Sequence, residues 1–262
     1  MPPPLTALVI TFNESANIAR CLGRLDWVER VVVLDSGSTD GTQQIARSFP
    51  NVEIIERAFD TFAGQCNFGL AQIGSEWVLS LDADYILGEG FERAAIAAIQ
   101  SGRAQAYRAP FRYCIHGRGL SATLYPPRIV LYRREAARYE NEGHGHRVRI
   151  NGKAGLLGAA IDHDDRKPLS RWFASQIKYA AAEAEFLAST HADQLGRIDR
   201  LRVRGWVMPV LAPLYCIVVK GLWRDGQAGW HYTLQRWVAE CMIALALLDR
   251  RCTRSNASIP SP

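Results

Sequence analysis

The stretch WVLSLDAD, residues 77–84, decides the fold class. A short apolar run, typical of a buried strand, ends there in two aspartates one residue apart, Asp82 and Asp84. Two earlier apolar runs also end in polar clusters, and segments with helical spacing separate the runs. This alternation of strands and helices predicts an α/β fold with a mostly parallel sheet flanked by helices.

The alternation is regular up to residue 100. From 101 to 166 it gives way to shorter strand candidates with glycine-rich connections, and a predicted helix over Ser170–Ala188 then opens a tryptophan-bearing tail. The expected strands are Leu5–Thr11, Arg30–Leu34, Val52–Ile55, Trp77–Leu81, Ala106–Arg112, Arg128–Tyr132, Arg147–Asn151 and Leu156–Ile161. The expected helices of the first part are Ser15–Leu25, Thr42–Ser48, Ala63–Ile73 and Glu89–Gln100.

Polar residues follow three of the strands directly, in the clusters Thr11–Glu14, Asp35–Asp40 and Asp82–Asp84. Ligands of parallel sheets bind outside the carboxyl ends of the strands, so we expect these clusters to converge on one site. Two neighbouring carboxylates repel each other unless a cation lies between them and a ligand. Hard oxygen ligands without cysteine favour Mg²⁺ or Mn²⁺, held mostly through substrate phosphates. The alternative is a structural acid pair in a loop or a helix cap.

The chain contains neither G-x-G-x-x-G nor G-x-x-x-x-G-K-[ST]. The absence of these motifs argues against dinucleotide-dependent oxidoreductases and against P-loop enzymes. The net charge of +5 at first suggests a nucleic-acid binder. However, residues 1–195 carry 21 Lys and Arg against 22 Asp and Glu, whereas the tail from Gly196 carries 10 against 4. The excess positive charge therefore belongs to the tail alone.

The tail combines its positive charge with four of the seven tryptophans, which is more typical of a membrane-surface segment than of a nucleic-acid groove. Its longest charge-free run, Gly205–Val219, has 15 residues, whereas a spanning helix needs about 20. We therefore expect monotopic attachment to a membrane, the alternative being that the tail helices are buried packing elements. The tail tryptophans are Trp206, Trp223, Trp230 and Trp237.

The six cysteines form no C-x-x-C pair, and the apolar N-terminal stretch lacks the basic region of a signal peptide. We interpret the cysteines as reduced thiols. The expected location is the cytoplasmic face of the inner or plasma membrane.

Four motifs in this order resemble the family 2 glycosyltransferases of the GT-A fold. They are VITFNE (9–14), VLDSGSTDGT (33–42), QCN (65–67) and LSLDAD (79–84). Within the family, the chain is most similar to the membrane-associated transferases that build lipopolysaccharide cores and similar envelope glycans. This narrower resemblance rests on Trp27, Gln65–Leu70, Tyr125–Arg128 and His163–Trp172.

The resemblance implies a nucleotide-sugar donor. The family usually has arginine where this chain has Cys66, so a donor contact would be lost or supplied from elsewhere, for instance by Arg128. Cys66 itself is interpreted as a small core residue. The donor-binding residues implied by position are Thr11, Asn13, Glu14, Asp35, Asp40, Asn67 and Asp82, with Arg166, Lys167 and Arg171 as candidates to neutralise the diphosphate.

The resemblance also implies that Asp84, helped by Asp82, binds the metal ion that bridges the diphosphate. His163 ends a strand candidate, where GT-A enzymes often place a late metal ligand. The alternative interpretation of His163–Lys167 is a polar loop before the next helix. A zinc site formed by His144, His146 and His163 is a further alternative.

The acceptor hydroxyl needs a general base, and the resemblance places that base within Glu140–His146. The candidates are Glu142, His144 and His146. We choose Glu142, because a carboxylate is the usual base in the family and the following glycine would let the backbone approach the sugar closely. His146 is the alternative, since a gap-free alignment to the more common Val-His-Glu pattern places it where that glutamate falls.

The prediction is an inverting, metal-dependent glycosyltransferase that moves a sugar from a nucleotide donor to a glycolipid or oligosaccharide acceptor of the lipopolysaccharide type. Residues 1–100 would bind the donor, 101–166 would form the acceptor side, 167–254 the membrane-associating tail, and 255–262 would be disordered. One alternative is a metal-dependent nucleotidyltransferase, although its usual glycine- and lysine-rich loop is missing from Thr11–Ala16. The other is a non-catalytic nucleotide-sugar-binding protein.

Overall fold

The computed structural model describes the backbone of residues 4–142 and 145–257, and the side chains of 142–146 and 254–257 lie outside its description. The chain divides into two compact units, each described below by itself. The sheet unit comprises Met1–Gly119 and Thr123–Lys167. The helical unit comprises Leu120–Ala122 and Pro168–Pro262.

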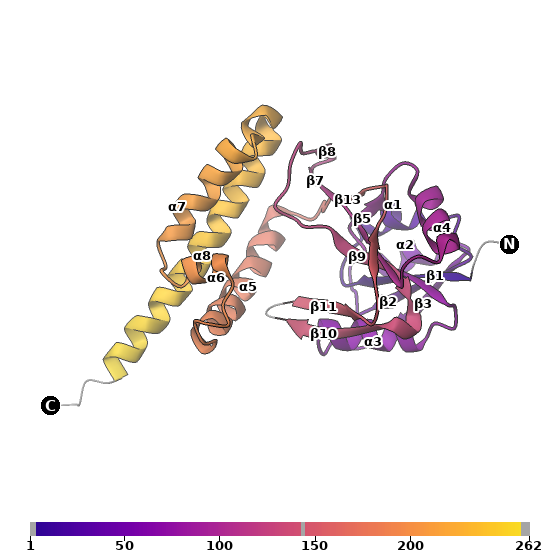
Figure 1. The fold of residues 1–262 in the computed structure, drawn as a ribbon, viewed down its shortest axis with the longest axis horizontal. Coiled ribbons are helices and arrows are strands. Elements are labelled where there is room, and N and C mark those ends of the chain that lie inside the picture. The colour runs from indigo at the N-terminus through magenta and orange to yellow at the C-terminus, as the bar shows by residue number, and fades with distance from the viewer. Residues whose placement is uncertain (1–3, 143–144, 258–262) are drawn as a thin grey trace. The chain divides into compact units, whose positions relative to one another are not determined.

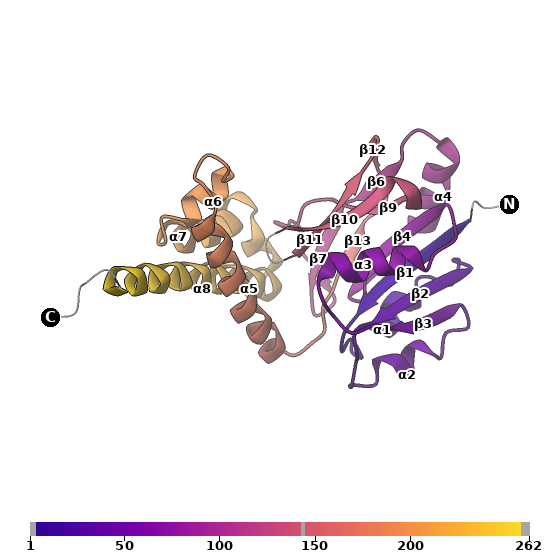
Figure 2. The same cartoon turned by 90° about the horizontal axis from the view of Figure 1, so that it is seen from below.

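A seven-stranded sheet forms the core of the sheet unit (Figure 2). Strands β4, β1, β2 and β3 run parallel to one another, whereas β9 is antiparallel to its neighbours β4 and β6. The predicted α/β fold with a mostly parallel sheet is therefore confirmed. In spatial order the strands are β12 (Ala154–Leu156), β6 (Ala106–Ala109), β9 (Arg128–Arg133), β4 (Trp77–Asp82), β1 (Leu5–Thr11), β2 (Arg30–Asp35) and β3 (Val52–Glu56).

Alternating side chains of the central strands pack against helices on both faces of this sheet. Ala7 and Val9 of β1 belong to the apolar cluster under α1, α2 and α4, whereas Leu8 belongs to the cluster under α3. A hairpin of β10 and β11 packs beside α3. The bounds are α1 (Ile18–Leu22), α2 (Thr42–Ala46), α3 (Phe62–Ala71), α4 (Phe91–Ser101), β10 (Ala137–Glu142) and β11 (Gly145–Ile150).

A second, four-stranded sheet positions the segment that ends at His163. Its strands, in spatial order, are β5 (Tyr85–Leu87), β13 (Ile161–His163), β7 (Phe111–Ile115) and β8 (Arg118–Gly119). His163 pairs with Tyr85 across the antiparallel β13–β5 ladder. This register brings His163 next to the chain that leaves the Asp82–Asp84 motif.

Two predicted strands were wrong as single elements. Ala106–Arg112 is divided between β6 and β7 at Pro110, which has no N–H to donate to a ladder. Leu156–Ile161 is divided between β12 and β13, because the chain crosses there from one sheet to the other. β5, β8 and β10 were not predicted.

The helical unit is built on its longest helix, α8, which packs against α5 and α7 (Figure 1). The predicted helix Ser170–Ala188 is confirmed as α5. α8 continues over residues 255–257, where disorder was predicted, and the rest of that prediction lies outside the described residues. The helices are α5 (Leu169–Ser189), α6 (Arg197–Arg202), α7 (Val207–Leu214), the π-helical turn η2 (Tyr215–Val219), the 3₁₀ turn η3 (Leu222–Asp225) and α8 (Gln227–Ala257).

Buried charges fix α6 against α8 and α5. Arg202 donates to both carboxylate oxygens of Glu240 at 3.0 and 2.8 Å and to Glu183 at 3.1 Å. Glu240 is 2% exposed. Among the described helices, none is both long enough and apolar enough to cross a bilayer.

Candidate active site

The carboxyl ends of β1, β2 and β4 meet at one edge of the large sheet, as predicted. Thr11 is the register partner of Asp35, and Ile10 is the partner of Asp82. The hydroxyl of Thr11 is buried there without a hydrogen-bond partner. The polar clusters after these strands therefore lie on neighbouring chains.

Asp35 organises the loop that follows β2. Its side chain is fully buried and accepts hydrogen bonds from the amides of Gly37 and Ser38, from the Ser38 hydroxyl and from Gln43 Nε2, at 2.5–2.9 Å. The loop is tied to the β1 end, because the amide of Asn13 donates to Ser38 Oγ at 2.7 Å. The buried carboxylate thus fixes the conformation of the loop after β2, which forms one wall of the site.

Asp40 and Asn13 complete this wall. Asp40 accepts hydrogen bonds from Thr42 and from the amide of Ser15. Burial raises the pKa of Asp40, but these hydrogen bonds prevail and lower it to about 2. Asn13 has a left-handed backbone with a φ of 55°, and its Oδ1 accepts the amide of Thr39 at 2.8 Å. Both side chains are thus engaged in hydrogen bonds that fix the geometry of these loops.

Asp84 and His163 form a polar pair at the strand ends. Asp84 Oδ2 lies 3.1 Å from His163 Nε2, and both side chains are largely buried. Burial raises the pKa of Asp84, but the neighbouring His163 prevails and lowers it. Burial likewise opposes the positive charge of His163, yet Asp84 raises its pKa. Each residue therefore stabilises the charged form of the other.

Three tyrosine rings surround His163. The ring centroids of Tyr85, Tyr113 and Tyr125 lie 5.3, 4.8 and 5.2 Å from that of the imidazole. His163 Nδ1 is buried here without a hydrogen-bond partner. The cage fixes the ring so that Nε2 faces Asp84.

Glu14 is buried beside this pair. Its Oε2 accepts a hydrogen bond from Asn17 at 2.7 Å, and its Oε1 is paired with Lys167. Burial and the negative charge of Asp84 raise the pKa of Glu14 to about 7, against the opposing effect of Lys167. Lys167 also lies 3.5 Å from Asp165. Lys167 thus places a positive charge between carboxylates of two distant segments.

Asp164 secures the segment after β13 to α1. It is 3% exposed and pairs with Arg20 and Arg166, each at 2.8 Å. The amide of Arg166 also donates to Asn17 Oδ1 at 2.9 Å. The segment His163–Lys167 is therefore built into the site. Sequence reasoning missed Asn17 and Arg20, because nothing local in the sequence shows that the β13 end would meet α1.

Arg128 stands at the start of β9, near Asp82. Its guanidinium stacks on Tyr125, 4.4 Å from the ring centroid, and the Tyr125 hydroxyl lies 2.6 Å from that of Tyr85. Burial lowers the pKa of Arg128, but Tyr125, Tyr85 and then the negative charge of Asp82 raise it. Among the described residues, no carboxylate forms an ion pair with Arg128, whereas Arg20, Arg166 and Lys167 are all paired.

The third motif has structural contacts. Cys66 is 1% exposed in the apolar cluster beneath the sheet, which agrees with its interpretation as a core residue, and burial raises the pKa of its thiol. Asn67 pins β10 to α3, because its amide exchanges hydrogen bonds with the main chain of Tyr139 at 2.9 Å. Its side-chain amide is thus already engaged.

A divalent cation fits part of the predicted ligand set. Two cis ligands about 2.1 Å from an octahedral ion lie about 3 Å apart, which matches the spacing of Asp84 Oδ2 and His163 Nε2. Within the described residues, however, no three His, Cys, Asp or Glu side chains are gathered closely enough to hold an ion. Asp82 ends β4 and Asp84 lies in the turn that follows, so the two carboxylates do not share a strand face. Substrate phosphates would have to complete the shell.

Two of the candidate bases, Glu142 and His146, lie on β10 and β11. The backbone of Glu142 pairs with Gly145, and that of Asn141 pairs with His146. The side chains of Glu142, His144 and His146 lie outside the described residues, and so does the proposed zinc site that includes two of them.

Two features belong to the helical unit. Arg171 lies on α5, outside the unit that carries the other predicted donor residues.

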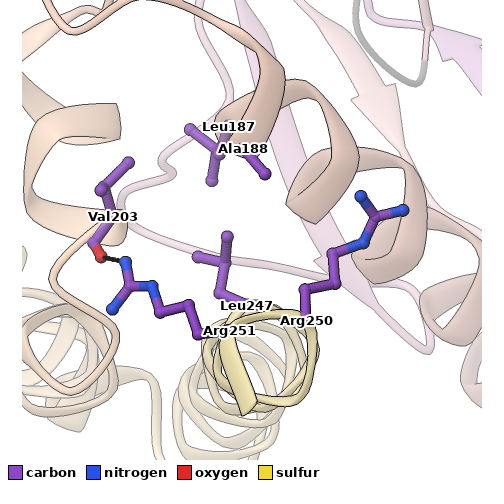
Figure 3. Close-up of a pocket in the computed structure, with 6 residues that line it drawn as sticks. All are labelled: Leu187, Ala188, Val203, Leu247, Arg250 and Arg251. Atoms are coloured by element: carbon purple, nitrogen blue, oxygen red, sulfur yellow. Dashed lines mark hydrogen bonds between the residues drawn. The ribbon is translucent and has the colours of Figure 1, made fainter. Parts of the chain in front are cut away.

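A pocket of about 220 Å³ lies between α5 and α8, with Leu187, Val203 and Leu247 in its wall (Figure 3). Arg250 and Arg251 flank it, and Arg251 donates to the carbonyl of Val203. No predicted site residue lines this pocket.

The sequence from residue 6 to 161 matches the profile of Glycosyl transferase family 2, and the chain belongs to this family. It is a glycosyltransferase, which removes the nucleotidyltransferase alternative.

Two curated relatives illustrate the range of similarity. The chain is 24% identical to the lipopolysaccharide core biosynthesis glycosyltransferase LpsC of Rhizobium meliloti, over 98% of this chain and 96% of LpsC. It is 34% identical to the uncharacterized glycosyltransferase RP128 of Rickettsia prowazekii, over 32% of this chain and 29% of that protein.

Among solved structures, S. aureus TarS 1-349 in complex with UDP-GlcNAc aligns with 95% of this chain and 92% of its own, at 15% identity and a TM-score of 0.49. A likeness of this degree is too weak to assign a ligand to this chain.

Proposed function

We propose that this glycosyltransferase moves a sugar, with inversion, from a nucleotide-sugar donor to a membrane-borne glycolipid of the lipopolysaccharide-core type. The observation that carries the proposal is the Asp84–His163 pair at the strand ends, beside the loops that follow β1 and β2. Such an edge is where ligands of parallel sheets bind.

The leaving group of the reaction is a nucleoside diphosphate, whose developing charge needs cationic partners. Asp84 and His163 would hold Mg²⁺ or Mn²⁺ together with the donor phosphates, and the metal would supply electrostatic stabilisation of the leaving group. Asp82, at the end of β4, would help Asp84 to bind the metal. The loops organised by Asp35 and Asp40 would receive the nucleoside.

Arg128 is the second cationic contact that we propose for the diphosphate. It is the one described arginine beside Asp82 that has no carboxylate partner, and Tyr125 holds it by stacking. A guanidinium binds phosphate oxygens in a bidentate manner, so Arg128 would substitute for the arginine that the family usually has at position 66.

Glu142 is the proposed general base, with His146 as the alternative. β10 is attached to α3 through Asn67 and Tyr139. The hairpin is therefore anchored to the unit that also carries Asp84 and His163. A base on this hairpin would take the proton of the acceptor hydroxyl as the new glycosidic bond forms.

The proposed acceptor class and the proposed membrane location are supported by two different observations. Similarity to LpsC extends over nearly the whole of both chains, which supports an acceptor of the same class. The basic, tryptophan-rich tail supports attachment to the cytoplasmic face of a membrane, where such an acceptor is presented.

The test is release of nucleoside diphosphate from a panel of nucleotide sugars, with Mn²⁺ or with excess chelator and with membrane glycolipid as acceptor. Asp84→Asn should lose activity by about 10²-fold or more, the usual worth of a fixed electrostatic group in a transition state. Asp162→Asn is the matched control, because this carboxylate lies on β13 next to His163 but pairs with Arg112. Full activity in excess chelator would reject the metal.

A further inference from the structure

The helical unit exposes an uncharged apolar face that its own helices leave uncovered. From Gly205 to Val219 the chain has no charged residue. α7 and η2 form one continuous helical stretch there, because the backbones of Leu214 and Tyr215 at the junction are both right-handed helical. The exposed large side chains on this stretch and its flanks are Trp206, Val210, Leu211, Leu214, Tyr215, Val218, Val219 and Trp223.

The opposite face of the same stretch is anchored. Val207, Ala212 and Cys216 are buried, and α7 lies along α8 in both views of the molecule (Figures 1 and 2). The exposed side chains recur at intervals of three or four residues, so they share one side of the helix. One face of the stretch is therefore packed against α8, and the opposite face is apolar and exposed.

The turn that follows presents aromatic and cationic groups at the end of this face. Lys220 Nζ lies 5.8 Å from the ring centroid of Tyr215, and the Arg224 guanidinium lies 5.2 Å from that of Trp223. Neither cation forms an ion pair with a described carboxylate. Arg204 is exposed at the other end of the stretch.

This turn has a defined geometry. Gly226 has a φ of 61° and a ψ of −136°, which essentially only glycine adopts. A Cβ at Gly229 would lie 1.8 Å from the carbonyl oxygen of Leu222, so the chain also needs glycine there. Asp225 accepts two hydrogen bonds from Ser121, at 3.0 and 2.9 Å. The only carboxylate of residues 205–225 is therefore used inside the unit.

We infer that the segment Gly205–Arg224 enters the interface of an anionic lipid bilayer, lying in its plane, whereas the C-terminal half of α8 does not. Exposed apolar side chains flanked by tryptophans and basic groups fit the boundary between headgroups and acyl chains. Anionic lipid complements Lys220 and Arg224. A second copy of the chain would bring no carboxylate of this segment against them.

The inference rests on the membrane attachment proposed above and names the part of the chain that carries it. Leu245 is a matched control position, because it is 69% exposed and Val218 is 70% exposed. Leu245 lies on α8 outside the uncharged stretch, four residues before Asp249. A charge introduced at either position should leave the fold intact.

The test is flotation of the full-length protein with phosphatidylcholine vesicles that contain or lack phosphatidylglycerol. Wild type and Leu245→Glu should float equally with anionic vesicles, whereas Val218→Glu should bind at least tenfold more weakly. Replacing Lys220 and Arg224 with glutamine should weaken binding to the anionic vesicles by about fivefold for each cation. Equal thermal unfolding of all variants would show that folding is unaffected.

Three outcomes would overturn the inference. If wild type ignores anionic vesicles, membrane attachment fails as a whole. If Val218→Glu floats like wild type, attachment stands but this segment does not carry it. If wild type is a dimer in light scattering without lipid and Val218→Glu is a monomer, the face is an interface between copies. Donor turnover in detergent is measured separately and bears on the proposed transfer reaction alone.

Discussion

Asp84 Oδ2 and His163 Nε2 lie 3.1 Å apart although 79 residues separate them in the sequence. One residue follows the central strand β4, and the other ends β13 of the second sheet. The β13–β5 register and the tyrosine cage fix the imidazole, so the pair is preorganised. A site that needs no rearrangement to bind charge can stabilise a leaving group more effectively.

Arg128→Gln should raise the KM for the donor by about 10- to 100-fold, the usual worth of a hydrogen bond to a charged group. Arg133→Gln is the control, because Arg133 lies on the same strand and stacks on Trp77 at 5.1 Å but pairs with Glu76. Initial rates over a range of donor concentrations measure the effect. An equal rise in KM for both variants would show that Arg128 acts only on the fold.

Glu142→Gln should reduce turnover by about 10²–10⁴-fold, as expected for loss of a general base, with donor affinity nearly unchanged. His146→Ala should retain most activity. The measurement is kcat beside donor Kd from calorimetry. If Glu142→Gln transfers at nearly the parent rate while His146→Ala is inactive and still binds donor, the histidine is the base.

Glu14 should make the stability of the metal-free protein depend on pH. Burial and Asp84 raise its pKa from 4.5 to about 7, so the folded protein holds this proton more tightly than the unfolded chain does. The resulting contribution is fully present below pH 4.5 and is lost as pH rises through 7. At about 1.4 kcal/mol per pKa unit, the loss amounts to about 3 kcal/mol.

Urea unfolding at pH 5 and pH 8 checks this contribution. Glu14→Gln should remove most of it, so the difference in unfolding free energy between pH 5 and pH 8 should be smaller than in wild type. Glu53→Gln, at an exposed salt bridge with Arg30, should behave like wild type. Identical pH dependence of wild type and Glu14→Gln would refute the assignment.

Arg202→Ala should destabilise the helical unit by about 3–5 kcal/mol, because it leaves Glu240 and Glu183 buried without their cation. Arg204→Ala, two residues away and exposed, should change the unfolding free energy by less than about 0.5 kcal/mol. Denaturant unfolding followed by circular dichroism measures both. A small effect of Arg202→Ala would mean that water solvates these carboxylates.

The sequence predicted the elements whose apolar patterns are local. The four parallel strands and their terminal clusters follow from short apolar runs ending in polar residues, and the structure has them within a residue or two. Pro110 and the crossover after Leu156 broke two predicted strands, because a continuous run of strand-forming residues does not reveal which sheet each half will join.

Many residues of the site were predictable one by one, but Asn17, Arg20 and the way the residues assemble were not. Asp84 and His163 were both named as metal ligands, and the structure brings them together. Asp82, the third predicted ligand, ends β4, and against the effect of burial its negative charge adds to that of Asp84 in raising the pKa of His163. The contacts of Arg20 with Asp164 and of Lys167 with Glu14 depend on tertiary packing across 144 and 153 residues, which no local pattern encodes.

The most direct test of the central claim is electron paramagnetic resonance of Mn²⁺ titrated into the protein with a nucleoside diphosphate. We predict that wild type and Asp162→Asn convert the hexaaqua signal into a protein-bound signal only when the diphosphate is present, and that Asp84→Asn and His163→Ala do not. A bound signal of equal strength in Asp84→Asn and His163→Ala would contradict the account, and so would donor binding that is unchanged by removing the metal.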